Sequence, residues 1–320
     1  MKIGFIGCGL IAHFHADVFK ELGVNIFAVS ARDNSSNLIP FAEKFGIGNR
    51  YTNWETMVEK ESLDVLWVMA SWDQMDSLLI PLIKTGIPLF LEKPIALSSK
   101  RIHDAIDIHL QKNQYIQVGY NRRFYPIVET IKSFISTGEL RSVLVEIPES
   151  INLNHKKLVS KLWLVNSSHM IDLLYYIVGP MTIKYKKHKS PLGSTYTSGF
   201  NAMLETENGV PVHLIAEWNS SNNYGITFFV DNKRIVLKPL ETASFYEGYD
   251  LIEPSKARPI RQYKPKLINS YDCDGKFKPG FYEQVKYFID NYKLPDGVSK
   301  HADLNQCLLT TSLIEKLLER

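Results

Sequence analysis

The sequence predicts an α/β protein in two parts. Residues 1–120 should form a doubly wound parallel sheet, and residues 121–320 an α+β domain with a largely antiparallel, open sheet. The length of 320 residues suits two domains of ordinary size. Up to Tyr120, short apolar runs alternate with helical patterns, which is typical of parallel strands joined by helices. After Met181, strand follows strand around turn signals such as Asn208-Gly209, which indicates antiparallel pairing.

The composition is that of a soluble globular protein, with 45% hydrophobic and 22% charged residues. A formal net charge of +3 argues against dedicated nucleic-acid binding, which needs a concentrated basic face. The cysteines Cys8, Cys273 and Cys307 are odd in number and share no metal-ligand spacing, so a reducing compartment is expected rather than a disulfide framework. No apolar run is long enough to cross a bilayer. We therefore expect a cytoplasmic protein without a metal site and without a membrane or nucleic-acid partner.

A glycine motif near the N-terminus predicts a nucleotide site. Residues 2–6 form an apolar strand pattern, Gly7-Cys8-Gly9-Leu10-Ile11-Ala12 follows at once, and a helical pattern comes next. Strand, GxGxxA and helix in this order are the context of a dinucleotide-binding fingerprint. Gly7 permits the tight turn, Gly9 lets the backbone approach a pyrophosphate, and Ala12 keeps the helix close to the sheet. The helix N-terminus faces the phosphate charge, so Leu10 and Ile11 should also contact the cofactor.

The end of the second predicted strand bears on the choice between NAD and NADP. An NAD site is expected to carry an acid there, for the ribose hydroxyls. The sequence instead reads Ser30-Ala31-Arg32-Asp33, with a hydroxyl and a guanidinium at the expected place. Arg32 can pair bidentately with a 2′-phosphate, which favours NADP. Alternatively, Arg32 lies over the adenine or in solvent and Asp33 binds the ribose of NAD.

Two further strand ends should face the same ligand. Ser71 and Trp72 follow the strand predicted at residues 64–69 and are expected on the nicotinamide side. The run Leu89-Phe90-Leu91 then stops at Glu92-Lys93-Pro94, where Pro94 favours an extended Lys93. Ligands bind at the carboxyl edge of open α/β sheets. Lys93 is therefore a candidate site residue, and Glu92 would position Lys93 or the cofactor.

A nearly all-apolar helix is predicted from His169 to Val178, with Asn166 or Ser167 as its N-cap. His169 and Asp172 lie three residues apart on one face of its first turn. Buried polar groups of this kind need partners. His169 and Asp172 either hydrogen-bond to each other or to another core group, or they line a cleft as an acid–base pair with shifted pKa values.

These motifs together resemble the glucose-fructose oxidoreductase/inositol dehydrogenase/MocA family. The resemblance covers nearly the whole chain, and the segments that carry it are GCGLIA at 7–12, Glu92-Lys93-Pro94, GYNRRF at 119–124, His169-Met170-Ile171-Asp172 and Gly280-Phe281. It implies a Rossmann domain, a nicotinamide cofactor, a sugar, polyol or sugar-nucleotide substrate, and a homo-oligomer (dimer or tetramer) formed through the C-terminal sheet.

The family's catalytic lysine maps onto Lys93, and its histidine and following acid map onto His169 and Asp172. One departure is Val165, where family members usually have an aspartate. This change removes one acid–base or substrate-orienting group, and Asn166 is left to bind a sugar hydroxyl.

The expected function is reversible hydride transfer between NADP(H), or NAD(H), and a carbinol carbon. His169 would move the hydroxyl proton, Asp172 would orient its imidazole, and Lys93 would stabilise the charge on the oxygen. Asn121 and Arg122 would bind substrate. Three alternatives stay open: a transient-redox enzyme that eliminates or cleaves a glycoside, a non-catalytic cofactor sensor, and an interaction protein that uses only its sheet face. In the second domain, a polar loop is expected at 153–161 and a long surface excursion at 246–278.

Overall fold

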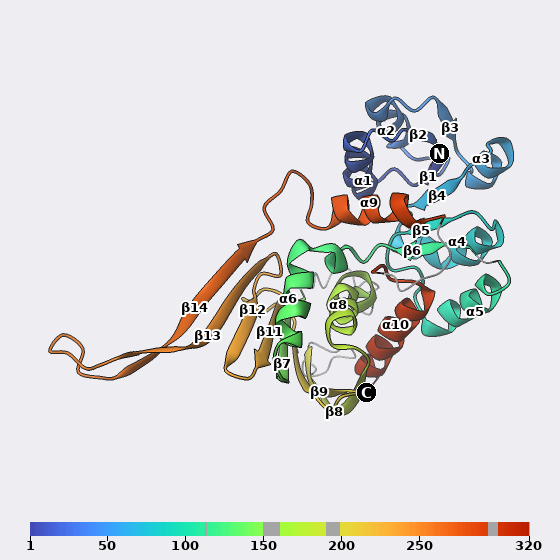
Figure 1. Ribbon diagram of the computed structural model, residues 1–320. Coiled ribbons are helices and arrows are strands. Elements are labelled where there is room, and N and C mark those ends of the chain that lie inside the picture. Colours follow the sequence, from blue (N-terminus) through green and yellow to red (C-terminus); the bar gives the residue numbers. More distant parts are fainter. Residues whose placement is uncertain (113, 150–160, 190–198, 294–299, 320) are drawn as a thin grey trace. The chain divides into compact units, whose positions relative to one another are not determined.

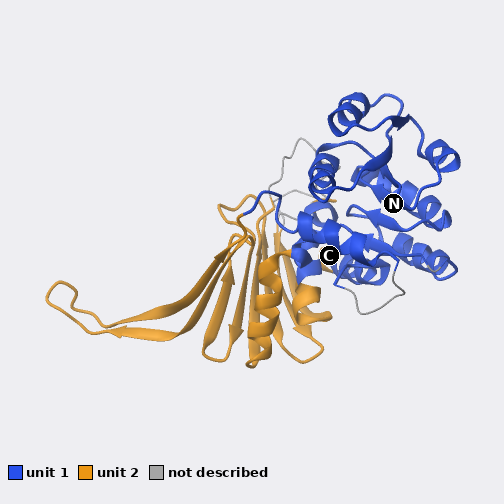
Figure 2. Cartoon of the chain, turned by 45° about the horizontal axis from the view of Figure 1, so that its top comes forward, with its two compact units in different colours: residues 1–124, 163–173, 275–316 blue, residues 125–162, 174–274, 317–320 orange. Residues whose placement is uncertain are grey.

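The computed structural model describes residues 1–112, 114–149, 161–189, 199–293 and 300–319. These residues form two compact units (Figure 2). Unit 1 comprises 1–124, 163–173 and 275–316, and unit 2 comprises 125–162, 174–274 and 317–320. Helical segments from the middle and the end of the chain thus group with the N-terminal residues, whereas the sequence predicted one boundary near residue 120. The predicted loop at 153–161 lies almost wholly outside the described residues.

Unit 1 contains the predicted parallel sheet. Its six strands are β1 (Ile3–Ile6), β2 (Ile26–Ser30), β3 (Asn49–Tyr51), β4 (Val65–Val68), β5 (Leu89–Leu91) and β6 (Ile116–Val118), in the order β3-β2-β1-β4-β5-β6. Every neighbouring pair is parallel. The chain leaves β1 in one direction for β2 and β3 and in the other for β4 to β6. The doubly wound fold is therefore confirmed, and its switch point lies between β1 and β4.

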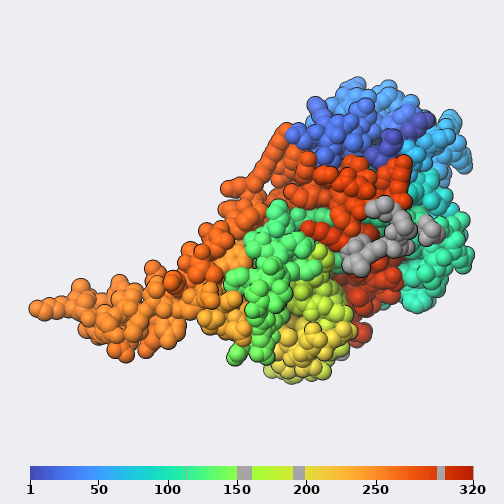
Figure 3. Space-filling model, viewed as in Figure 1, coloured from blue at the N-terminus to red at the C-terminus, as the bar shows by residue number. Residues whose placement is uncertain are grey.

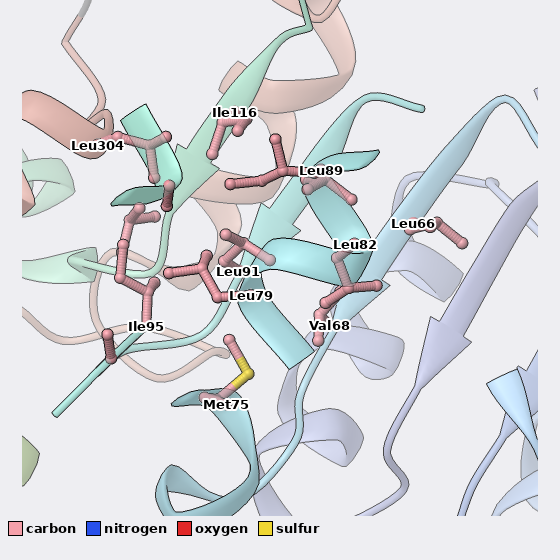
Figure 4. Packing of buried hydrophobic residues seen from close by; sticks show 14 of the residues in the cluster. Leu66, Val68, Met75, Leu79, Leu82, Leu89, Leu91, Ile95, Ile116 and Leu304 are labelled. Atoms are coloured by element: carbon pink, nitrogen blue, oxygen red, sulfur yellow. The ribbon is translucent and has the colours of Figure 1, made fainter. Parts of the chain in front are cut away.

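Helices cover the sheet because its strands are apolar on both faces. They are α1 (Leu10–Glu21), α2 (Leu38–Phe45), α3 (Trp54–Lys60), α4 (Trp72–Lys84), α5 (Ser99–His109), α9 (Phe281–Asn291) and α10 (Leu304–Leu318). One core includes Leu66, Val68, Leu89 and Leu91 (Figure 4). The other is aromatic and joins β1 and α1 to α9, which comes from residues far along the chain.

Unit 2 contains an eight-stranded sheet in the order β14-β13-β12-β11-β7-β10-β9-β8 (Figure 1). Its strands are β7 (Leu140–Ile147), β8 (Met181–Lys189), β9 (Gly199–Thr206), β10 (Pro211–Glu217), β11 (Gly225–Val230), β12 (Lys233–Leu237), β13 (Thr242–Ile252) and β14 (Gln262–Asp272). All pairs are antiparallel except β7 with β10. The predicted largely antiparallel sheet and its hairpin around residues 208–209 are confirmed, and a second hairpin turns at residues 231–232.

One face of this sheet is buried and the other is not. Leu204, Leu214, Phe228 and Phe245 point into the core. Helix α6 (Pro126–Ser136) packs on that inner face, where the ring centroids of Phe134 and Phe245 lie 5.2 Å apart. The alternation of buried and exposed residues along β9 and β10 is the pattern of a sheet with one solvated face.

One local prediction is confirmed but lacked the strands, and another is wrong. Residues 246–278 are largely exposed, as expected of a surface excursion, but they include the second part of β13 and all of β14. Prolines and charges hid the alternating pattern of this hairpin. Asn166 and Ser167 are not an N-cap, because a π-helical turn, Trp163–Ser167, runs directly into α8 (Ser168–Val178). The hydroxyl of Ser168 donates to the carbonyl of Leu164 at 2.7 Å, so it bonds back along the helix instead of capping it.

In the part of the chain that the structure describes, no helix is both long and apolar enough to cross a membrane.

The aromatic core of unit 1 generates a stability prediction. Trp67 on β4 is fully buried, stacks on Phe90 with centroids 3.9 Å apart, and meets Phe19 edge-on at 4.8 Å. Replacing this indole with a methyl group removes a large buried apolar surface and leaves a cavity. Trp67→Ala should therefore lower the free energy of unfolding by about 3–5 kcal/mol, measured by urea denaturation. The exposed Leu110→Ala is the control and should change it by less than about 0.5 kcal/mol. Equal effects of the two changes would contradict this account of the core.

Candidate cofactor and catalytic site

A cleft of about 560 Å³ opens at the carboxyl ends of β1, β2, β4 and β5, at the switch point of the sheet. Ligands bind at this place in doubly wound folds. Its walls include most of the predicted cofactor residues, namely Gly7, Gly9, Leu10, Ile11, Ser30, Arg32, Ser71 and Glu92. Trp72 and Lys93 do not line it. Trp72 begins α4, and Lys93 follows the lining residue Glu92 along the chain.

Glycine suits the two motif positions for different structural reasons. Gly7 has a φ of +101°, and a Cβ there would lie 2.5 Å from the carbonyl oxygen of Met69. Any side chain would therefore strain the turn and collide with β4's end. Gly9 precedes α1 with ordinary backbone angles, and a Cβ there would meet no atom within 4 Å. Its missing side chain leaves open space beside the helix N-terminus, which fits the close approach of a pyrophosphate.

The ribose end of the cleft is cationic and rich in hydroxyls. Arg32 lines the cleft, together with Ser30, Ser35 and Asn37, whereas Asp33 is exposed and is not among the lining residues. The side chains of Cys8 and Ser35 are in contact, with Sγ and Oγ 3.6 Å apart. Burial raises the pKa of the Cys8 thiol, so Cys8 serves here as a neutral wall. This chemistry fits a phosphorylated ribose better than one bound by a carboxylate.

Glu92 is the acid at the inner end of the cleft. It continues β5, with its backbone N–H donating to the carbonyl of Val68 at 2.9 Å. Its carboxylate lies against Gly119, where a Cβ would be only 2.5 Å from Oε2. Burial raises the pKa of Glu92 to about 7, although Lys93 and Lys278 oppose this rise. The group can therefore gain or lose a proton near neutral pH.

Lys93 reaches the turn that precedes α8. Its ammonium donates to the backbone carbonyl of Val165 at 2.5 Å. Val165 belongs to the π-helical turn, and such turns occur frequently at functional sites. The backbone oxygen of Val165 thus binds Lys93, although the valine side chain at this position carries no carboxylate.

His169 lies at the start of α8, only 9% exposed, with the ring of Tyr120 edge-on at 5.7 Å. Burial lowers its pKa well below the usual value, and Lys93, Arg122 and Lys278 lower it further. The imidazole is therefore neutral at physiological pH. Its Nδ1 atom is buried and has no hydrogen-bond partner among the described residues.

Asp172 does not orient His169, contrary to the prediction. Both of its oxygens accept from Arg123, at 2.8 Å from Nε and 2.6 Å from Nη2. The two side chains are almost completely buried. A planar guanidinium satisfies both oxygens of a carboxylate, so the imidazole does not compete for it. The same Arg123 donates through Nη1 to Gln306 at 2.6 Å and to the carbonyl of His301 at 3.4 Å.

The predicted substrate residues lie in two places in unit 1. Asn121 is buried, and its side-chain amide donates to the carbonyl of Pro279 at 2.9 Å. This bond holds the turn Asn121–Phe124 against the segment that contains Lys278. Arg122 is half-buried in that turn, close enough to lower the pKa of His169. Asn166 lies in the π-helical turn beside Val165.

Sequence reasoning missed several cleft residues, including Thr52, Asn53, Trp54, Gln74 and Ser77. The first three follow β3, a strand of three residues that the sequence did not predict. The rule that ligands meet carboxyl strand ends would have found them, once that strand was recognised. Arg123 and Lys278 were missed because their partners are distant in sequence.

Comparison with known proteins supports the resemblance seen in the motifs. Residues 1–120 match the glucose-fructose oxidoreductase/inositol dehydrogenase/MocA model, described as an oxidoreductase family with an NAD-binding Rossmann fold. The resemblance inferred from the motifs is confirmed, and the protein is an NAD(P)-dependent oxidoreductase that acts on CH–OH groups.

Relatives extend this similarity along the chain. Inositol 2-dehydrogenase from Corynebacterium glutamicum is 23% identical over 300 residues, which cover 91% of this chain and 85% of the relative. An Agrobacterium radiobacter oxidoreductase, solved with NAD+, L-tartaric acid and magnesium, has a TM-score of 0.77 at 15% identity and covers 98% of this chain and 94% of its own. UDP-N-acetylglucosamine 3-dehydrogenase from Acidithiobacillus ferrooxidans has a TM-score of 0.76 at 13% identity, with 99% and 96% covered. These two structures show that the oxidoreductase shares its fold with them.

Glu92 gives the oxidoreductase a specific pH dependence. With a pKa near 7, its carboxyl is neutral below this pH and negative above it. A negative charge in the cleft opposes an anionic cofactor, so the affinity for NADH should fall about tenfold as the pH rises through 7. Glu92→Gln should abolish this change, measured by fluorescence titration from pH 5.5 to 8.5. NADH is preferred to NADPH for this test, because a phosphate monoester itself titrates near pH 6. The exposed Glu59→Gln should keep the wild-type profile, and an unchanged profile in Glu92→Gln would refute the assignment.

Proposed function

We propose that this oxidoreductase transfers a hydride between NADP(H) and a carbinol or keto carbon of a sugar, polyol or nucleotide sugar. One observation carries the proposal: the ammonium of Lys93, which directly follows a cleft residue, binds the carbonyl of Val165 four residues before His169 and lies close enough to help lower the pKa of that buried imidazole. The bound nicotinamide accepts the hydride in oxidation and supplies it in reduction.

In this proposal, His169 accepts and returns the hydroxyl proton. A neutral imidazole can accept the hydroxyl proton as the carbon is oxidised. The nearby cations that lower its pKa also make its protonated form a stronger acid, so the proton returns readily in the reverse direction. Its buried Nδ1 lies in unit 1 beside Tyr120.

Lys93 stabilises the negative charge that develops on the reacting oxygen. Its hydrogen bond to the carbonyl of Val165 fixes the ammonium, so little reorganisation is needed during reaction. Asp172 contributes indirectly, through Arg123, by holding the first turn of α8. Asn166 and Arg122 are the proposed substrate contacts, and Asn121 supports the turn that carries Arg122.

The substrate class rests on chemistry and on relatives. A histidine–lysine pair beside a nicotinamide suits a secondary alcohol. Relatives include enzymes named for inositol and for UDP-N-acetylglucosamine. A homo-oligomer formed through the C-terminal sheet is part of the proposal.

The proposed reaction is tested by adding a panel of keto-sugars and nucleotide-linked keto-sugars to the protein with NADPH or NADH. Oxidation of either cofactor is followed by absorbance. Cofactor binding without net turnover on any of them would favour the transient-redox enzyme or the sensor.

Removing either proposed catalytic group should abolish most of the activity. Lys93→Ala and His169→Ala should each lower kcat by about 10²–10⁴-fold, because one loses charge stabilisation and the other the proton acceptor. Stopped-flow measurement of single-turnover hydride transfer reports this step directly. Lys100→Ala and His103→Ala, on the exposed side of α5, are matched controls and should retain wild-type rates. Full activity of His169→Ala would disprove its role as base.

Cofactor preference should depend on Arg32. Arg32→Ala removes the proposed partner of the 2′-phosphate, so the Kd for NADPH should rise by about 10–100-fold while that for NADH changes less than about threefold. Isothermal titration calorimetry with both cofactors measures the two values. The nearby exposed Arg50→Ala should alter neither. A parallel loss of both affinities would instead place Arg32 over the adenine.

A further inference from the structure

Lys278 is a cation near the candidate site to which the proposed reaction gives no role. It precedes α9, which lies at the surface of unit 1 next to the N-terminal part of the chain (orange-red beside blue in Figure 3). The side chain of Lys278 is exposed, and its ammonium lies over the rings of Phe14 and Phe281, 5.5 and 5.0 Å from their centroids. Among the described residues this ammonium has neither an ion pair nor a hydrogen bond. The two rings therefore position a charge that a ligand can still bind.

Hydrogen bonds fix the backbone on both sides of Lys278. The N–H of Phe281 donates to the carbonyl of Lys278 at 3.1 Å, at the start of α9. The side-chain amide of Asn121 donates to the carbonyl of Pro279 at 2.9 Å, and Asn121 begins the turn that contains Arg122. Lys278 and Arg122 therefore belong to two segments, far apart in the sequence, that are bonded to each other.

Three cations from three segments of unit 1 lie near the proposed base, His169. Lys93 follows β5 and binds the carbonyl of Val165, four residues before the histidine. The other two cations come from the pair of bonded segments. Burial lowers the pKa of the imidazole most, and the charges of Lys93, Arg122 and Lys278 lower it further. Because a charge shifts a pKa only from nearby, all three cations lie close to this ring.

The two acids of the candidate site do not balance these cations. Asp172 is already paired with Arg123, which donates to both of its oxygens. Glu92 lies close enough to Lys93 and Lys278 for their charges to act on it, yet burial raises its pKa to about 7. Its carboxyl is therefore only partly ionised at neutral pH. These two acids leave a surplus of positive charge, which an anionic ligand would reduce.

The phosphates of the cofactor do not account for this surplus. The space beside Gly9 fits the pyrophosphate and Arg32 fits a 2′-phosphate, and both of these residues line the cleft. Lys93, Arg122 and Lys278 are not among the described residues that line it. The oxidised nicotinamide brings a further positive charge. The anion that meets the three cations must therefore belong to the other ligand of the site, the substrate.

We propose that the substrate of this oxidoreductase carries an anionic group, a carboxylate or a phosphate, near its reacting carbinol, and that Lys278 binds this group together with Arg122. Lys93 and His169 keep the roles proposed above at the reacting oxygen. The inference rests on the proposed function and narrows its substrate class. Sugar acids or sugar phosphates are preferred to neutral polyols, because only an anionic substrate offsets the surplus charge.

Three-carbon alcohols provide a binding test that does not depend on the stereochemistry of a sugar. Racemic glycerate carries a carboxylate next to a carbinol, racemic glycerol 3-phosphate carries a phosphate, and glycerol is the neutral reference. Each is titrated to about 100 mM into the protein saturated with NADPH, at constant ionic strength, and the fluorescence of the bound nicotinamide reports the Kd. At least one of the two anions should bind about 10–100-fold more tightly than glycerol, because hydrogen bonds to charged groups are stronger than those between neutral groups.

Variants of one loop show whether Lys278 is responsible. Lys278→Gln removes the charge and should raise the Kd of the preferred anion about 10–100-fold, while that of glycerol changes less than about threefold. Lys278→Arg keeps the charge and should keep the preference. Lys276→Gln is the matched control, because Lys276 is an exposed lysine two residues earlier that pairs with Glu21, and it should bind all three alcohols as the wild type does. The thermal midpoint confirms that each variant is folded.

Two outcomes would overturn the proposal: a wild-type complex that binds neither anion more tightly than glycerol, and an anion preference that survives Lys278→Gln. Tighter binding of glycerate would identify sugar acids as the substrate class, and tighter binding of glycerol 3-phosphate would identify sugar phosphates. The test needs no turnover, so its result is separate from that of the proposed function. An anion preference without hydride transfer to any keto-sugar would refute the reaction alone, whereas hydride transfer without an anion preference would refute the substrate class alone.

Discussion

The buried pair of Arg123 and Asp172 is the interaction on which the arrangement of unit 1 depends. It joins the turn after β6 to the first turn of α8, and Arg123 also binds Gln306 on α10 and the carbonyl of His301. Burying two charges is costly, and their bidentate geometry with further hydrogen bonds offsets that cost. Loss of one partner would leave an uncompensated charge in the core. The position of His169, three residues before Asp172, follows from this anchor.

The electrostatics around that anchor explain how the candidate site could work. Arg123 neutralises Asp172, so the carboxylate gives His169 no charge to raise its pKa. Burial, and after it the charges of Lys93, Arg122 and Lys278, lower the pKa of His169 and keep the imidazole neutral. The same cations favour negative charge on a reacting oxygen, and Glu92 is the acid whose proton is exchangeable near pH 7. In the proposed reaction, one set of cations therefore keeps the proton acceptor neutral and stabilises the charge on the oxygen.

Unit 2 is built on a different principle. Its sheet buries one face under helix α6 and leaves the other, with Tyr185, Met203, Ile215 and Phe229, without cover from the described residues. The register places Tyr249 and Leu251 on one face of the hairpin of β13 and β14 and Asp250 and Lys264 on the other, and residues 247–261 are exposed. The alternation of apolar and polar side chains thus continues beyond the strands that pair with β12.

The sequence by itself determined the features that depend on neighbours along the chain. The glycine motif, the strand ends at Ser30, Ser71 and Glu92, and the hairpin at 208–209 were all read from local patterns, because turn geometry and strand alternation are local properties. The tertiary structure decided what depends on distant residues. It assigned Asp172 to Arg123 instead of His169, gave Lys93 the carbonyl of Val165, and showed that the surface excursion at residues 246–272 consists of paired strands. Ion pairs, π-helical turns and burial arise from segments that meet only in the folded chain, and no periodicity in the sequence encodes which partner a buried charge will find.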